Sequence, residues 1–256
     1  MTIDCSTRDG IARVVLSRPE KRNAITPAMH EALTELWPRL EADPRVRVIV
    51  LTGKGSAFCA GADVHEFLPH IARLIAEGKD PGHFCGLTRR VPGKPMIAAV
   101  NGPAYGGGME LMLASDIRIA SDKARFALPE VQLGAIAGAG GITRLFRELP
   151  TAIANEMVIT GNPIDAARAF QLGLVSAVHP PDELAPAAEA LARRITSNAP
   201  LAVMASRDLG AIAGDDPLEE ALEREREGFR QIVETEDFRI GTKGFGGAAP
   251  PIYVGR

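Results

Sequence analysis

The chain has 256 residues, of which 46% are hydrophobic and 24% are charged, so it carries enough apolar surface for a large folded core. A formal net charge of −3 excludes the strongly basic field by which proteins hold nucleic acids, and we expect no nucleic-acid partner. No segment approaches a charge-free apolar span, and the first residues lack a basic region followed by an apolar run, so we expect no membrane partner and a cytoplasmic location.

The first part of the chain predicts a hairpin, a helix and a buried strand. Residues 2–8 and 11–17 flank Asp9-Gly10, a dipeptide that tolerates the positive φ angles of a tight turn. Thr26-Pro27 is typical of a helix N-terminus, and apolar residues then recur at helical spacing until Asp43-Pro44. Residues 46–53 follow as an apolar strand that ends in glycine.

The remaining elements indicate a mixed α/β fold with a helical C-terminal part. A second apolar strand at 95–100 enters a glycine-rich loop, and 113–121 supplies another short strand. Residues 181–236 predict three helices, with breaks at 198–200 and 214–217. The charged stretch 218–237 fits either a solvated surface helix or a subunit-packing helix, and we expect the Gly- and Pro-rich end, 241–256, to be extended.

Two glycine-rich loops each lie between a strand and a predicted helix. One contains Gly53, Gly55 and Gly61, after which Ala62 and Asp63 are expected to start a helix; in the other, residues 106–108 open a helix. Neither loop matches a dinucleotide fingerprint or a phosphate-binding P-loop. The glycines serve either tight turns and close packing alone, or an oxyanion hole in which one N–H from each loop meets an oxygen that becomes negative.

Three segments resemble the signature segments of the crotonase, or enoyl-CoA hydratase/isomerase, superfamily. They are AFCAGAD at 57–63, VNGPAYGGGMEL at 100–111 and FALPEVQLGAIAGAGG at 126–141, and the similarity runs from 18–25 to the terminal Gly-Arg. The resemblance implies an α/β crotonase-type spiral of ββα units over residues 1–195, containing the CoA and active sites. It also implies a helical oligomerisation region and tail over 196–256, and self-association as a homotrimer or hexamer.

The resemblance also implies which residues carry the chemistry. The main-chain amides of Ala62 and Gly107 would form the oxyanion hole, and Glu110 and Glu130 would be the two catalytic carboxylates. Two carboxylates around one water can share the proton transfers of hydration, since repulsion between them raises one pKa toward neutrality. The two glutamates are 130 − 110 = 20 residues apart, so only the tertiary fold can bring them together.

Binding of coenzyme A is implied for a further set of residues. Arg22 is the expected phosphate contact. The main chain from Arg22 to Ala24 is expected to lie near the adenine. The other predicted CoA or substrate contacts are Ala60, Asp63, Val64 and His65. His65 stands where many relatives carry lysine, and Phe245 precedes an atypical tail. Lys243 is the candidate for the basic contact that this tail lacks.

The acyl group is expected to lie against region 64–92, where Phe67, Leu68, Ile71 and Phe84 are either pocket walls or core residues. Cys5, Cys59 and Cys85 lack metal-ligand spacing and are interpreted as small core residues in a reducing compartment. We expect no metal and no separate cofactor, because CoA is part of the acyl-CoA substrate.

Together, these features predict an enoyl-CoA hydratase, which adds water reversibly to trans-2-enoyl-CoA and gives 3-hydroxyacyl-CoA. Two other crotonase reactions remain open, namely enoyl-CoA isomerisation and dehydration of carnitinyl-CoA. The segments FALPE and LPTAIANEMVITG are similar to the carnitinyl-CoA dehydratase subgroup. A protein that binds acyl-CoA without catalysis is the alternative from a different class, and retention of both glutamates argues against it.

Overall fold

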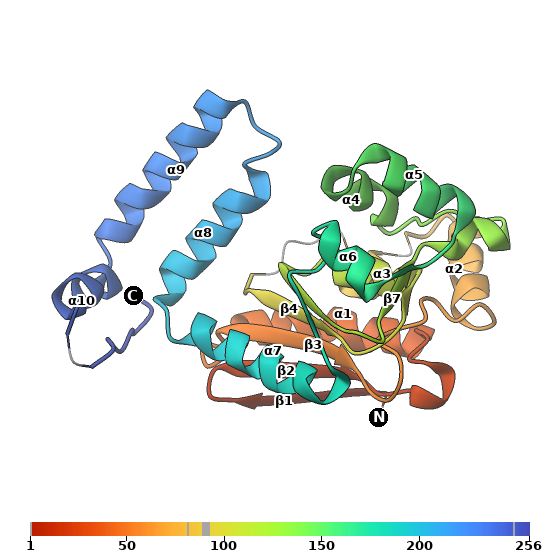
Figure 1. Cartoon of the computed structure of the whole chain (residues 1–256), viewed down its shortest axis with the longest axis horizontal. Helices are drawn as coiled ribbons and strands as arrows, with labels where there is room; N and C mark the ends of the chain where they lie inside the picture. The colour runs from red at the N-terminus through yellow and green to blue at the C-terminus, as the bar shows by residue number, and fades with distance from the viewer. Residues whose placement is uncertain (1, 81, 89–92, 248) are drawn as a thin grey trace.

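A six-stranded sheet forms the centre of the computed structural model, which describes residues 2–80, 82–88, 93–247 and 249–256 (Figure 1). Its strand order is β1 (Ile3–Arg8), β2 (Ile11–Leu16), β3 (Val48–Gly53), β4 (Met96–Val100), β6 (Ile117–Ser121) and β9 (Ala177–His179). The β1–β2 pair is the predicted antiparallel hairpin, and the other neighbours pair in parallel. A smaller sheet contains β5 (Ala104–Tyr105), β7 (Arg125–Ala127) and β8 (Ile164–Asp165).

Helices cover both faces of the large sheet, which explains why its central strands are unbroken apolar runs. On one face lies α1 (Pro27–Ala42), where the Thr26 side chain accepts the N–H of Met29, as the N-cap pattern predicts. The opposite face is covered by α7 (Pro181–Thr196), which buries Leu184, Ala188 and Ala192. Alternate residues of the central strands β3 and β4 therefore enter two different hydrophobic clusters.

The remaining short elements come mainly from the middle of the chain. They are η1 (Pro19–Lys21), α2 (Phe67–Ala76), η2 (Phe84–Gly86), α3 (Gly107–Leu113), η3 (Pro129–Leu133), α4 (Gly141–Glu148), α5 (Thr151–Thr160) and α6 (Ala166–Gln171). The prediction that Ala62 and Asp63 start a helix is wrong, because α2 begins at Phe67. Ala62 instead forms a parallel bridge with Ile25, which holds residue 62 in an extended conformation.

The C-terminal part forms three helices that extend from the body in Figure 1: α8 (Pro200–Ile212), α9 (Leu218–Val233) and α10 (Glu236–Gly244). The three helices predicted within 181–236 are confirmed as α7, α8 and α9. The expectation of an extended chain from 241 is wrong for its first residues, which α10 contains. Thr235 caps this helix by accepting the N–H of Phe238, and the helix continues through Gly241.

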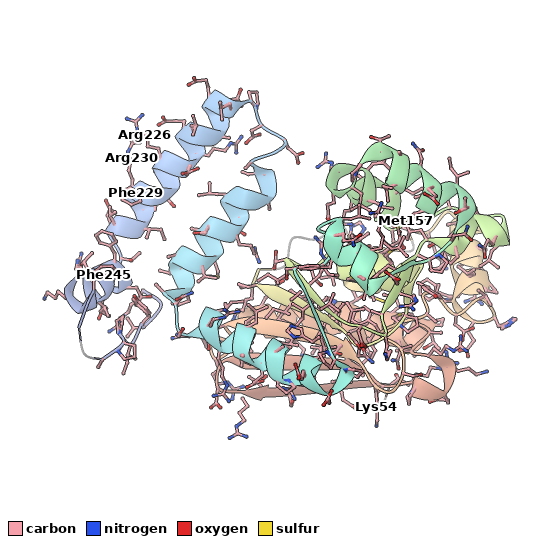
Figure 2. The ribbon with its side chains drawn as sticks, in the orientation of Figure 1. Lys54, Met157, Arg226, Phe229, Arg230 and Phe245 are labelled. Atoms are coloured by element: carbon pink, nitrogen blue, oxygen red, sulfur yellow. The ribbon has the colours of Figure 1, made fainter. Side chains whose placement is uncertain are left out.

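Several surface features complete the fold. Within α8 and α9 no residue is buried, and Arg226, Phe229 and Arg230 lie on the side of α9 that faces away from α8 (Figure 2). The predicted domain boundary at 195/196 falls at the last residues of α7.

Of the three cysteines, Cys59 and Cys85 are buried as expected. Cys5 is exposed on the edge strand β1, so its interpretation as a core residue is wrong. Over the described ranges, no helix is both long and apolar enough to cross a membrane.

Candidate active site

A cavity of about 960 Å³ lies beside the two loops that follow β3 and β4. Its lining includes Ala62, Gly107, Glu110 and Glu130, so the four residues expected to carry the chemistry share one space. The two glutamates reach it from different elements, because Glu110 lies in α3 and Glu130 in η3. The tertiary fold thus brings together residues that the sequence places far apart.

The two glycine-rich loops are in direct contact. Cys59 forms a parallel bridge with Ala104, and its carbonyl accepts the N–H of Tyr105 at 3.0 Å. Gly61 has a φ of +97°, and a Cβ there would lie 2.8 Å from the Tyr105 carbonyl oxygen. A Cβ on Gly108 would lie 2.2 Å from the Cys59 oxygen, so no side chain fits between the loops at either point.

The N–H groups of Ala62 and Gly107 are available to a ligand, because neither donates a hydrogen bond to another described residue. Gly107 is the first residue of α3, and its N–H therefore lacks a partner one turn earlier. At the bridge between Ile25 and Ala62, the Ile25 N–H donates to the carbonyl oxygen of Gly61, and the Asp63 N–H donates to the carbonyl oxygen of Ile25. The Ala62 N–H takes no part in this pairing. These N–H groups can stabilise a negative oxygen between them.

Glu110 is held in a fixed orientation deep in the site, with 4% of its surface exposed. Its Oε1 atom accepts the N–H of Ala139 at 2.7 Å and that of Gly141 at 3.0 Å. Burial raises the pKa of the Glu110 carboxyl, and the two N–H groups and the nearby charge of Arg144 oppose that rise. A carboxylate held in this way can act as a positioned proton acceptor.

Glu130 has a different environment. Burial raises the pKa of Glu130 to about 7, and the charge of Glu110 acts in the same direction. Its Oε2 atom is buried and has no hydrogen-bond partner among the described residues. Its Oε1 atom lies against the second glycine loop, where a Cβ on Gly106 would come within 3.0 Å. Near neutral pH, Glu130 can therefore both hold and release a proton.

Apolar side chains line much of the remaining cavity. Phe67, Leu68, Ile71 and Phe84, the expected pocket walls, all belong to the lining. The rings of Phe67 and Phe84 pack edge to face, with centroids 5.4 Å apart. Leu133 and Ile136, which the sequence did not single out, lie at the same cavity from the segment after Glu130. Residues 81 and 89–92 of the predicted specificity region lie outside the described part of the chain.

The residues predicted to contact CoA divide into two groups. Ala60 and Val64 line the cavity, whereas Arg22, Ala24, Asp63 and His65 do not. The carboxylate of Asp63 forms an ion pair with Arg18 at 2.7 Å and accepts the N–H groups of His65 and Glu66. These bonds organise the turn before α2. Direct contact between Asp63 and the substrate stays a prediction.

The other predicted CoA contacts lie at the protein surface. Arg22 is exposed and adopts a left-handed conformation, with its carbonyl accepting the N–H of Ala60. His65 is also exposed. Lys243 lies on α10 and does not belong to the lining of this cavity. Phosphate binding by Arg22 stays a prediction.

Sequence reasoning missed Asn23, which connects the 18–25 segment to the first glycine loop. Asn23 is fully buried, and its side chain donates to the carbonyl oxygens of Ala57 at 2.8 Å and Lys54 at 3.0 Å. Its Oδ1 atom accepts the N–H of Arg18 at 2.9 Å. Position 23 has a φ of 57°, in the left-handed region that asparagine tolerates better than most residues. The asparagine itself, in the 18–25 segment, was the signal that the sequence offered.

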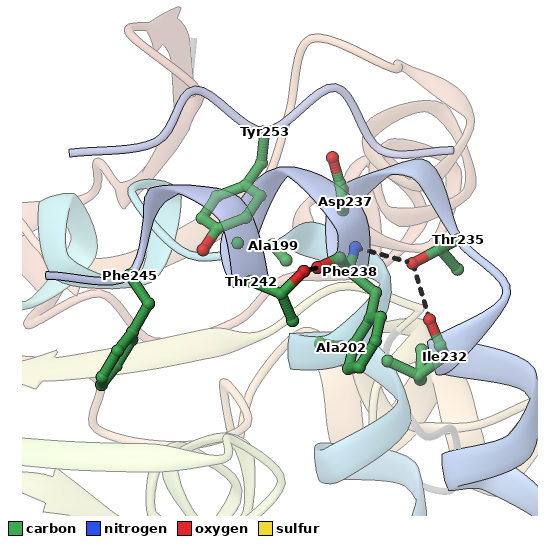
Figure 3. A pocket seen from close by; sticks show the side chains of 10 residues that line it. Ala199, Ala202, Ile232, Thr235, Asp237, Phe238, Thr242, Phe245 and Tyr253 are labelled. Carbon is green, nitrogen blue, oxygen red and sulfur yellow. Dashed lines mark hydrogen bonds between the residues drawn. The ribbon is translucent and has the colours of Figure 1, made fainter. Parts of the chain in front are cut away.

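A second cavity, of about 470 Å³, lies among α8, α9, α10 and the C-terminal tail (Figure 3). Its lining is mainly apolar and includes Phe238, Phe245 and Tyr253. Asp237 is its acidic residue, and that carboxylate accepts the N–H groups of Val254 at 2.6 Å and Gly255 at 2.9 Å. Since this group is already hydrogen bonded to the tail, we assign the second cavity no chemistry.

Comparisons with known proteins extend over nearly the whole chain. The family model described as enoyl-CoA hydratase/isomerase matches residues 6–255. The chain is similar to (E)-benzylidenesuccinyl-CoA hydratase of Thauera aromatica, with 39% identity over 256 residues and 100% of both chains covered. It is also similar to carnitinyl-CoA dehydratase of Proteus mirabilis (strain HI4320), with 38% identity over 267 residues, covering 100% of this chain and 99% of the relative.

Solved structures give the same picture. Enoyl-CoA hydratase from Mycobacterium tuberculosis H37Rv superposes with a TM-score of 0.90 and 34% identity, covering 100% of this chain and 99% of the other. Enoyl-CoA hydratase from Bacillus anthracis superposes with a TM-score of 0.91 and 32% identity, covering 100% of both chains.

Proposed function

The chain belongs to the enoyl-CoA hydratase/isomerase family, and we propose that it is an enoyl-CoA hydratase that reversibly converts trans-2-enoyl-CoA to 3-hydroxyacyl-CoA. The crotonase resemblance and the mixed α/β crotonase-type fold predicted from the sequence are confirmed. The protein is an enzyme with hydratase-type lyase activity on CoA thioesters. The specific reaction, its catalytic residues and its substrate are proposals.

The proposed oxyanion hole consists of the N–H groups of Ala62 and Gly107. When a nucleophile adds to the β-carbon of a conjugated thioester, negative charge moves to the thioester oxygen. Two main-chain donors at this cavity would stabilise the enolate, each by on the order of 3 kcal/mol. In support, neither N–H group donates a hydrogen bond to a described residue, and Ala62 and Gly107 both line the cavity.

The two glutamates divide the proton transfers. Ionised Glu110 takes a proton from water as the water oxygen bonds to the β-carbon, and the electrons of the double bond move toward the thioester to form the enolate. Protonated Glu130 then gives its proton to the α-carbon, and the carbonyl re-forms. The pKa of about 7 supports Glu130 as the group that holds the proton at the start. After the product forms, Glu110 releases its proton to solvent and Glu130 takes one up, which restores the starting state. Dehydration is the same sequence in reverse.

One observation carries this proposal: two glutamates from different elements line one cavity together with Ala62 and Gly107, whose main-chain N–H groups donate to no other described residue. An isomerase needs only to move a proton between carbons, so it does not need a second group to activate water. Removal of water from carnitinyl-CoA would, by its chemistry, call for the same two kinds of proton transfer as the dehydration direction above, so product analysis must separate these two reactions. Because the proton transfers fall to these carboxylates and CoA is part of the substrate, we propose that the reaction needs no metal and no separate cofactor.

The experiment is to incubate the purified protein with C4 to C16 trans-2-enoyl-CoAs and with crotonobetainyl-CoA. Loss of the conjugated-thioester absorbance, with a 3-hydroxyacyl-CoA product identified by mass spectrometry, is the expected result. A shifted double bond without a hydroxyl group would make the enzyme an isomerase instead. Turnover confined to crotonobetainyl-CoA would assign it to the carnitinyl-CoA reaction.

We also propose that the chain assembles as a homotrimer or hexamer through its C-terminal helices. In support, α9 carries Leu218, Leu222 and Phe229 with 73%, 51% and 62% of their surfaces exposed. Such side chains on a helix with no buried residue favour a covered face over a solvated one. Sedimentation equilibrium measures the assembly directly, and a monomer at micromolar concentration would contradict the proposal.

A further inference from the structure

We propose that His30 is a specificity-determining residue, whose Nε2–H group donates a hydrogen bond to an uncharged oxygen on the acyl chain of the substrate. The preferred substrates are then enoyl-CoAs that carry a keto group or a similar acceptor beyond the reacting double bond. This inference rests on the proposed hydratase function, because it names the substrate class of the same cavity.

His30 belongs to α1, and its side chain lines the same cavity as the two proposed catalytic glutamates. Its ring packs against Phe67 with centroids 5.4 Å apart, and Phe67 in turn packs edge to face on Phe84. Phe84 reaches the proposed oxyanion hole, since a Cβ on Gly107 would lie 2.6 Å from its ring. His30 therefore stands two ring contacts away from the reacting thioester, in the region expected to hold the acyl chain.

One nitrogen of the His30 ring is already in use. Its Nδ1 atom accepts the N–H of Cys85 at 2.9 Å, so the neutral ring carries its proton on Nε2. Burial lowers the pKa of His30; the charge of Glu31 opposes this shift and that of His70 adds to it. The ring is therefore neutral near pH 7 and presents one N–H donor without a positive charge.

The remaining donor of the ring, Nε2–H, has no acceptor among the described residues. Because Nε2 is not fully buried and the side chain lines the cavity, a ligand can reach this donor. The neighbouring rings of Phe67 and Phe84 offer no acceptor, so an alkyl chain bound against them would leave the N–H without a hydrogen bond. An uncharged oxygen satisfies it, whereas an anion would find no positive charge on this ring to offset its lost hydration.

The orientation of the His30 ring is fixed by the packing of α1 against η2. Trp37, on the same helix, donates its Nε1–H to the Cys85 carbonyl at 2.7 Å, so α1 side chains hold both main-chain groups of Cys85. The two elements are in close contact, because a Cβ on Gly86 would lie 2.7 Å from the Cα atom of Thr34. A donor held in this way loses little conformational freedom when a ligand binds, which favours discrimination between ligands.

The test compares a keto group with a methyl branch of the same size: 6-oxohept-2-enoyl-CoA against 6-methylhept-2-enoyl-CoA, and 7-oxooct-2-enoyl-CoA against 7-methyloct-2-enoyl-CoA. A ketone only accepts hydrogen bonds, and the two pairs place its oxygen at different depths in the cavity. For the wild-type enzyme we expect kcat/KM to favour the ketone of the better pair about tenfold. A wild-type enzyme with no preference for either ketone would overturn the inference.

Two substitutions separate the ligand contact of the ring from its contact with Cys85. In His30→Asn the side-chain oxygen can replace Nδ1 as the acceptor for Cys85, but the amide does not reach as far as Nε2, so the ketone preference should be lost. In His30→Gln the longer side chain can place an N–H donor near the Nε2 position, so part of the preference should remain. His179→Asn on β9, outside the lining of the cavity, is the matched control and should leave the ratio unchanged.

The alternative is that His30 only holds η2 in place. In that case His30→Asn, which keeps an acceptor for Cys85, would retain the ketone-to-methyl ratio of the wild type. That outcome overturns the inference, because the variant lacks a donor at the Nε2 position.

A binding measurement separates this inference from the proposed reaction. The saturated pairs, 6-oxoheptanoyl-CoA against 6-methylheptanoyl-CoA and 7-oxooctanoyl-CoA against 7-methyloctanoyl-CoA, need no turnover. Calorimetry should show about tenfold tighter binding of the ketone in the better pair, lost in His30→Asn. If that preference is found in a protein that hydrates none of the substrates, the His30 site stands and the hydratase proposal fails. If the protein hydrates alkyl enoyl-CoAs and binds both members of each pair equally, the hydratase proposal stands and the His30 site fails.

Discussion

The Oε1 atom of Glu110 accepts the N–H of Ala139 at 2.7 Å, which ties the first turn of α3 to the loop before α4. The N–H of Gly141 donates to the same oxygen at 3.0 Å. Both bonds fix the carboxylate without using its second oxygen, Oε2, which remains for the reacting water. The position of the proposed base thus depends on Ala139 in that loop and on Gly141 at the start of α4, which lie 29 and 31 residues further along the chain.

Glu110→Gln tests this base directly. Glutamine keeps an oxygen that can accept the Ala139 and Gly141 N–H groups, so we expect KM for crotonyl-CoA to change by less than about threefold. Loss of the proton acceptor should lower kcat by roughly 10²- to 10⁴-fold. Hydration is followed by the loss of thioester-conjugated absorbance, and a rate near that of the wild type would remove Glu110 from the mechanism.

The pH profile should report the proton shared by the two glutamates. The pKa of Glu130 is raised to about 7, so the pair retains one proton below that pH and loses it above. We expect kcat/KM to fall about tenfold per pH unit above roughly pH 7. Adding water releases no net proton, so hydration and dehydration should fall in parallel. Separate alkaline limbs for the two directions would contradict a shared proton.

Glu130 should also make stability depend on pH. Because its pKa is raised in the folded chain above the usual 4.5, the native state favours the protonated form. Its contribution is most favourable below pH 4.5, declines between pH 4.5 and about 7, and stays low above. Glu130→Gln should therefore raise the free energy of unfolding at pH 8, by on the order of 1 kcal/mol, and change it little at pH 4.

Urea titrations of the wild type and of Glu130→Gln at both pH values measure this difference. The matched control is Glu156→Gln, an exposed glutamate on α5, which should change stability equally little at pH 4 and pH 8. An equal gain for Glu130→Gln at both pH values would show that the gain does not come from its charge.

Gly107 and Phe84 should be energetically coupled. A Cβ on Gly107 would lie 2.6 Å from the Phe84 ring, so Gly107→Ala must displace either the ring or the start of α3 with its proposed oxyanion N–H. We expect Gly107→Ala to lower kcat at least tenfold. In a Phe84→Ala background the same substitution should cost less than threefold, because the space is then open. A double-mutant cycle on kcat measures the coupling, and additive effects would show that the ring does not hold the loop.

Asn23→Ala should destabilise the loop that carries Ala62. It leaves the carbonyl groups of Lys54, Ala57 and Phe58 without the Asn23 donor and forces alanine to adopt a φ of 57°. We expect a loss of about 2–4 kcal/mol in the free energy of unfolding, measured by urea titration. The control is Asn162→Ala at an exposed position, which should change stability by less than about 0.5 kcal/mol.

Local patterns predicted much of the fold because they depend on residues close in sequence. As predicted, Thr26-Pro27 lies at the start of α1, and Asp9-Gly10 connects β1 to β2. The fate of Ala62 could not be read locally, since a bridge to Ile25, 37 residues earlier, replaces the expected helix start. Likewise, α10 continues through Gly241 although glycine lowers helix propensity, because the Thr235 cap and the hydrogen bonds of Asp237 to the tail hold it.

The sequence by itself determined the family, the mixed α/β class and the two glutamates, since these depend on residue types at fixed spacing in three short segments. Only the tertiary structure decided that Glu110 and Glu130 line one cavity and that Asp63 pairs with Arg18. Both facts depend on residues distant in sequence. A glutamate pKa near neutrality arises from burial and from neighbouring charges, which exist only once the chain has folded.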